Sequence, residues 1–85
     1  MVQEEDDMAD VKVDSVLDAK GLNCPMPVLK TKKALDAMAS GQVLEVLATD
    51  KGAKSDITAL LKRLGHEMVE MREEGGVIEF YIRKK

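Results

Sequence analysis

The chain has 85 residues, of which 45% are apolar, 34% are charged and 2% are aromatic, and its 13 basic and 16 acidic residues give a net charge of −3. This length fits one small domain, and the apolar content is high enough to build a core, so a globally disordered chain is excluded. The scarcity of aromatic residues and of positive charge disfavours direct binding to nucleic acid. No apolar run approaches the ~20 residues that span a bilayer, so no membrane partner is expected.

The acidic charge is concentrated at the N-terminus. Residues 1–10 contain five acidic and no basic residues, which leaves residues 11–85 with a net charge of +2. We expect 1–10 to be an acidic, disordered tail and 11–85 to be a single domain. Because the first residues lack the basic-then-apolar order of a signal peptide, the chain is expected to be cytoplasmic.

In chain order, β-branched residues predict a first strand over 11–17, ended by residues 18–21. Apolar residues at helical spacing then predict a helix that starts near Pro25 and ends at Gly41. The apolar run over 43–48 is typical of an interior strand, and residues 50–52 indicate a turn.

The second half of the chain predicts one helix and two strands. A stripe at i, i+3, i+4 and i+7 predicts a helix ending at Gly65. Strands over 68–71 and 77–83 follow, and residues 73–76 form the hairpin connection between them. The order βαβαββ predicts an α/β (α+β) two-layer sandwich, in which two helices cover one face of a four-stranded mixed sheet.

The single cysteine limits the chemistry. One cysteine and one histidine form neither an intramolecular disulfide nor a zinc site with soft ligands, so no metal and no cofactor are expected. Cys24 lies between the first strand and the first helix and precedes Pro25, which disfavours the helical conformation at the cysteine. Pro25 suits the first helical position and Pro27 the first turn, where amides have no partner within the helix. Cys24 is therefore expected at or just before the N-cap.

A helix N-terminus favours a thiolate. The free amides of Met26 and Val28 and the nearby lysines, among them Lys30 and Lys33, are expected to add to this effect. Cys24 is thus the candidate catalytic residue, against the alternative of an inert, buried cysteine. His66 is a weak candidate for a base, because it follows a helix end and no third group is identifiable to orient it.

The run from Leu17 to Gly41, with Cys-Pro-Met-Pro over residues 24–27, resembles the TusA/SirA-like sulfur-carrier family. The similarity covers roughly residues 14–83 and continues through Asp50, Gly52, Asp56-Ile57, Gly65-His66-Glu67, Gly76 and the last strand with Phe80 and Ile82. The resemblance implies a two-layer α/β fold and a persulfide carried on Cys24, with Pro25 and Pro27 shaping the site.

The resemblance also implies protein partners. These are a cysteine desulfurase or a rhodanese-type sulfur donor, and an acceptor protein that leads toward tRNA thiolation, cofactor synthesis or sulfur oxidation. Whether such a sulfurtransferase-type carrier counts as an enzyme stays open, since turnover depends on these proteins. Met26, Lys30 and Lys33 are candidate docking or electrostatic residues. The alternative function is a non-catalytic regulatory or interaction module with a redox-sensitive cysteine.

Overall fold

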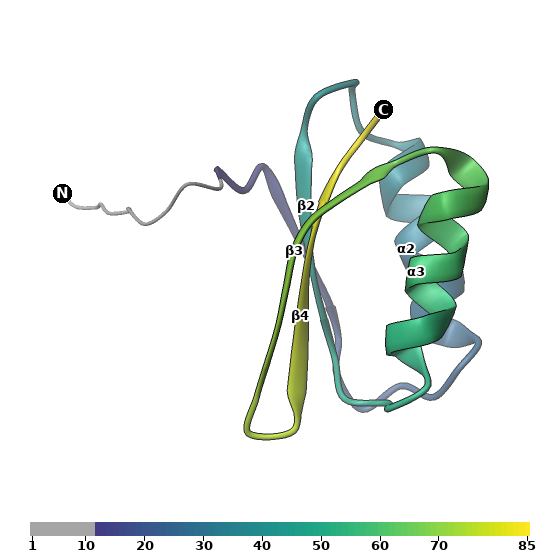
Figure 1. Ribbon diagram of the computed structural model, residues 1–85, viewed down its shortest axis with the longest axis vertical. Coiled ribbons are helices and arrows are strands. Elements are labelled where there is room, and N and C mark those ends of the chain that lie inside the picture. The colour runs from purple at the N-terminus through teal and green to yellow at the C-terminus, as the bar shows by residue number, and fades with distance from the viewer. Residues whose placement is uncertain (1–11) are drawn as a thin grey trace, which may run out of the picture.

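The computed structural model describes residues 12–85, which form four strands and two helices. In chain order these are β1 (Ser15–Ala19), α2 (Met26–Asp36), β2 (Val43–Ala48), α3 (Ala53–Leu64), β3 (Glu67–Glu74) and β4 (Val77–Arg83). The strands lie in the order β1-β2-β4-β3. Both helices cover the same face of the sheet, so the predicted two-layer βαβαββ fold is confirmed (Figure 1).

The sheet is mixed, as expected. β1 pairs with β2 in parallel, whereas β4 is antiparallel to both β2 and β3. The first strand was predicted too early, because pairing with β2 begins only at Ser15, opposite Leu44. Val13 precedes the strand, and Val11 and the predicted tail over 1–10 lie outside the described residues.

The first helix is shorter than predicted. α2 ends at Asp36, five residues before Gly41, because the N–H groups of Ala37 and Met38 turn back to carbonyls only three residues earlier. The Lys84 ammonium also donates to the carbonyl of Leu35, near this end of the helix. The apolar residue Met38 therefore packs against the core from the loop and not from the helix.

The second helix and the hairpin match their predictions. Gly65 ends α3 with a positive φ of 83°, and its N–H donates to the carbonyl of Leu61. Gly75 and Gly76 both have positive φ and join β3 to β4, as a tight hairpin turn requires. No helix within residues 12–85 has the length and apolar character to cross a membrane.

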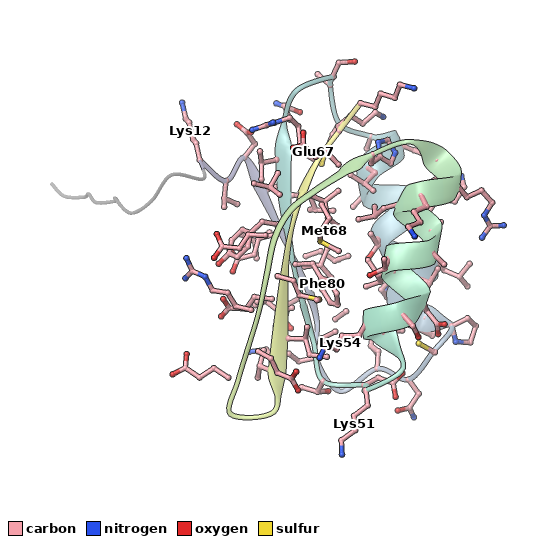
Figure 2. All side chains as sticks on the ribbon, viewed as in Figure 1. Lys12, Lys51, Lys54, Glu67, Met68 and Phe80 are labelled. Atoms are coloured by element: carbon pink, nitrogen blue, oxygen red, sulfur yellow. The ribbon has the colours of Figure 1, made fainter. Side chains whose placement is uncertain are left out.

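The core lies between the sheet and the helices. Phe80 is completely buried in β4, and Figure 2 shows it pointing, like Met68, from the sheet toward the helices. Leu35 of α2 and Ile57 of α3 are also completely buried and belong to the same apolar cluster. This cluster anchors both helices, and therefore the start of each helix, to the sheet.

Replacing Phe80 with Ala tests this core. We expect Phe80→Ala to lower the free energy of unfolding by about 3–5 kcal/mol, since it removes the largest buried side chain and leaves a cavity. Urea denaturation measures the change. Leu29→Ala is the control: Leu29 is 54% exposed on α2, so its loss should change stability by less than about 0.5 kcal/mol. Equal effects of the two substitutions would contradict this placement of the core.

Candidate functional site

The candidate site lies where the loops after β1 and β2 meet. Because β1 and β2 are parallel and Ala19 pairs with Ala48, the chain leaves both strands at the same edge of the sheet (Figure 1). The Gly21 N–H donates to the Thr49 hydroxyl across 2.9 Å and ties the two loops together. Residues that follow β1 therefore lie beside residues that follow β2.

Cys24 lies just before the N-cap of α2, as predicted, whereas Pro25 was predicted one position too far into the helix. The N-cap of α2 is Pro25, with φ −92° and ψ 9°, so helical residues begin at Met26 and Pro27 is the second of them. The Cys24–Pro25 peptide bond is cis. The Met26 N–H donates to the carbonyl of Asn23 across 2.9 Å. The prediction that this amide is free to face the sulfur was therefore wrong.

Two carboxylates reach Cys24 from the neighbouring segment. The Cys24 N–H donates to Asp50 Oδ2 across 3.4 Å. A Cβ atom built on Gly52 would lie 3.2 Å from Asp50 Oδ2, 3.8 Å from Asp56 Oδ2 and 3.9 Å from Cys24 Sγ. All three side chains thus converge on the space that Gly52 leaves open beside the half-buried sulfur.

These carboxylates determine the state of the thiol. Hydrogen bonds to Asp50 and, second, to Asp56 raise the pKa of Cys24 to about 12, with a further contribution from burial. The prediction of a lowered pKa was wrong, because the negative charges act directly on the sulfur whereas the helix N-terminus supplies only a partial positive charge. This arrangement favours the protonated thiol over the thiolate.

The lysines do not give the expected support to the thiolate, since the charged groups that shift the pKa of Cys24 are acidic. Lys30 and Lys33 are exposed on α2, and Lys33 belongs to its last turn. Lys32 pairs with Asp36 across 2.8 Å, also on the solvent side of α2. The strongest electrostatic influences on Cys24 are therefore acidic.

The remaining predicted site residues divide into a buried and an exposed group. Pro27 is fully buried against the core, whereas Met26 is 42% exposed next to Cys24. One turn further along α2, Leu29 is 54% exposed. It belongs to a groove of about 280 Å³ between the two helices, whose lining is four apolar and two basic residues: Val28, Leu29, Lys32, Leu60, Arg63 and Leu64.

His66 is far from the cysteine. It follows the C-terminal end of α3, whereas Cys24 lies near the N-terminal side of this helix, which is about 18 Å long. Its Nδ1 accepts a hydrogen bond from the Lys85 N–H, and burial lowers its pKa. Residues 12–85 contain no cluster of three or more His, Cys, Asp or Glu side chains that could hold a metal ion. The arrangement therefore offers a single thiol without an imidazole base.

Sequence reasoning named Asp50 and Asp56 only as positions of the family resemblance and gave neither a role at the site, because residues 50–52 were interpreted as a turn and Asp56 falls in the following helix. A signal was present in the predicted topology. If the strands over 11–17 and 43–48 are parallel neighbours, the residues that follow them meet at one edge of the sheet. The pairing of these two strands is therefore sufficient to place Asp50 next to Cys24.

The comparisons with known proteins agree with this architecture. The family described as Sulfurtransferase TusA matches residues 15–84. The YrkI protein of Bacillus subtilis is 57% identical over 74 residues, which cover 87% of this chain and 99% of YrkI. The sulfur carrier protein TusA of Allochromatium vinosum is 55% identical over 71 residues, which cover 84% of this chain and 93% of that protein.

A solved structure shows the same fold. The SirA-like protein of Desulfitobacterium hafniense superposes with a TM-score of 0.72 at 31% identity, over 81% of this chain and 95% of the other. The family match extends from the first residue of β1 to one residue beyond the end of β4, so it includes every strand and helix described above. This chain belongs to the TusA family of sulfur carrier proteins.

Proposed function

We propose that this chain accepts sulfane sulfur as a persulfide on Cys24 and passes it to an acceptor protein. The observation that carries the proposal is a lone, half-buried thiol, fixed at the start of a helix and remote from the only histidine. Such a group lacks the base that hydrolysis by a Cys–His pair requires, but it can still receive and release a covalent group. The donor is a cysteine desulfurase or a rhodanese-type protein.

The transfer is an exchange between two sulfur–sulfur bonds. Cys24 loses its proton, and the thiolate attacks the outer sulfur of the donor persulfide. The donor's S–S bond breaks as the new one forms, and the donor cysteine leaves as a thiolate that takes up a proton. Discharge repeats the step, with an acceptor thiolate attacking the outer sulfur on Cys24. No electrons are gained or lost overall, so no redox cofactor is needed.

The other site residues have supporting roles in this proposal. Pro25 restricts the backbone next to the reactive sulfur, and the buried Pro27 anchors the first turn of α2. Met26 provides an exposed, flexible apolar contact beside Cys24, and a protein donor covers it when it docks. Lys30 and Lys33 supply positive charge along the exposed side of the same helix.

Replacing Cys24 with Ser tests the carrier function. The chain is incubated with a cysteine desulfurase and cysteine, and separately with a rhodanese and thiosulfate, and its intact mass is measured without reductant. We expect a gain of one sulfur atom that a reductant removes, and no gain for Cys24→Ser, because a hydroxyl cannot form a persulfide. Circular dichroism checks that the variant is folded.

The same experiment separates the alternative function. A folded Cys24→Ser variant that still gains sulfur would contradict the role of Cys24. If neither donor loads the unsubstituted chain although its thiol is free, the result would favour a non-catalytic interaction module, whose partner binding persists in Cys24→Ser.

Comparing two proline variants tests the site-shaping role. Pro25→Ala removes the ring that restricts the backbone beside Cys24, and we expect it to slow sulfur transfer. Pro27→Ala removes buried atoms and should lower stability by about 1–2 kcal/mol. Stability is measured in urea and transfer by the rate of mass gain. An unchanged transfer rate in Pro25→Ala would reduce Pro25 to a helix-starting residue.

Replacing Met26 tests its docking role. Met26→Gln keeps the length of the side chain but loses its apolar contact, and we expect loading by a protein donor to slow by about three- to tenfold. Loading by inorganic polysulfide, which needs no docking surface, should keep its rate. Met71→Gln is the matched control, because Met71 is 41% exposed on β3. Equal slowing in both variants would argue against a specific contact at Met26.

A further inference from the structure

Two carboxylates face the sulfur that the proposed function requires to be a nucleophile. Asp50 lies in the loop after β2 and Asp56 in the first turn of α3, so both come from a different part of the chain than Cys24. Asp50 Oδ2 accepts the Cys24 N–H, and both carboxylates lie beside the open position at Gly52. A hydrogen bond from the thiol to a carboxylate stabilises the protonated form and opposes the thiolate.

The other charged groups near the site do not counterbalance this pair. On the segment that carries Cys24, Lys20 and Lys30 are exposed to solvent. On the opposite segment Lys51 is exposed and extends away from the body of the molecule, and Lys54 pairs with Glu73 across 3.0 Å (Figure 2). The charged groups that act on the thiol are Asp50 and Asp56, and both disfavour its ionisation.

We propose that Asp50 and Asp56 are positioning residues that keep Cys24 as a neutral thiol in the free chain, and that a donor loads the sulfur by bringing positive charge against this pair. The second half rests on the proposed function, since it concerns the donor. The free carrier is thereby protected from alkylation and oxidation, both of which consume the thiolate. Docking of a cationic donor surface relieves the repulsion at the moment when Cys24 must lose its proton.

The first test needs no sulfur donor. The rate of alkylation by iodoacetamide, a neutral reagent that consumes the thiolate, is measured from pH 6 to pH 11 on the full chain. Asp50→Asn and Asp50→Asn/Asp56→Asn keep the shape and an accepting oxygen but remove the charge. When the pKa of the thiol falls by one unit, the fraction of thiolate rises about tenfold. The alkylation rate rises only about threefold, because a thiolate of lower pKa is also a weaker nucleophile.

The expected result is therefore a profile displaced to lower pH in both variants. Alkylation near pH 8 should be faster by about threefold or more, and fastest in the double variant. Glu67→Gln is the matched control, since it removes one negative charge at the opposite end of the sheet from Lys51 (Figure 2). Its profile should coincide with that of the unsubstituted chain. If the profile of the double variant also coincides with that of the unsubstituted chain, the carboxylates do not keep the thiol protonated and the proposal is overturned.

The second test concerns the donor. Inorganic polysulfide brings no positive charge, so the double variant should gain sulfur from it faster than the unsubstituted chain. A protein donor that docks through cationic side chains should load the double variant no faster than the unsubstituted chain, because the carboxylates that attract those side chains are gone. Equal acceleration with both sources would overturn the requirement for a cationic donor. Failure of every source to load the unsubstituted chain would overturn the carrier function instead, and the alkylation profiles would still decide the role of the carboxylates.

Discussion

The parallel pairing of β1 with β2 is the constraint on which the candidate site depends. In a parallel pair, both strands deliver their following loops to the same edge of the sheet, and the crossover helix α2 begins there. This geometry places Cys24, which follows β1, beside Asp50, which follows β2, although 26 positions separate them in the chain. Ala19 and Ala48, the buried last residues of the two strands, hold the two following loops next to each other.

The two prolines decide what the helix can offer to the sulfur. A helix start normally presents several unpaired N–H groups, but proline has none, and here both Pro25 and Pro27 fall within the first positions. The Met26 N–H is already used by the carbonyl of Asn23. The start of α2 therefore fixes where Cys24 lies while leaving few donors to stabilise a negative charge on it. This turn therefore fixes the position of Cys24 but does little to stabilise a negative charge on its sulfur.

How much could be predicted from the sequence depended on the range of the interactions involved. The order of elements and the Gly65 helix end could be predicted, because periodicity and positive-φ glycines are local signals. The end of α2 could not, since no glycine or proline marks the turn at Ala37 and Met38, and Lys84, which contacts the Leu35 carbonyl, returns from the far end of the chain. The position of Cys24 was likewise local, but its surroundings required the pairing of β1 with β2.

The charge state favoured at Cys24 depends on whether the helix N-terminus or the two carboxylates act on the thiol more strongly. A helix N-terminus acts as roughly half a positive charge, and its effect decays within one turn. The carboxylates of Asp50 and Asp56 and the sulfur of Cys24 all lie beside the Gly52 position, and both carboxylates raise the pKa of the thiol. Since direct hydrogen bonds to charged groups outweigh a partial dipole at a helix end, the acidic pair dominates. If a donor supplies positive charge at this pair, as proposed above, the thiol gains reactivity where the donor docks and stays protected from side reactions elsewhere.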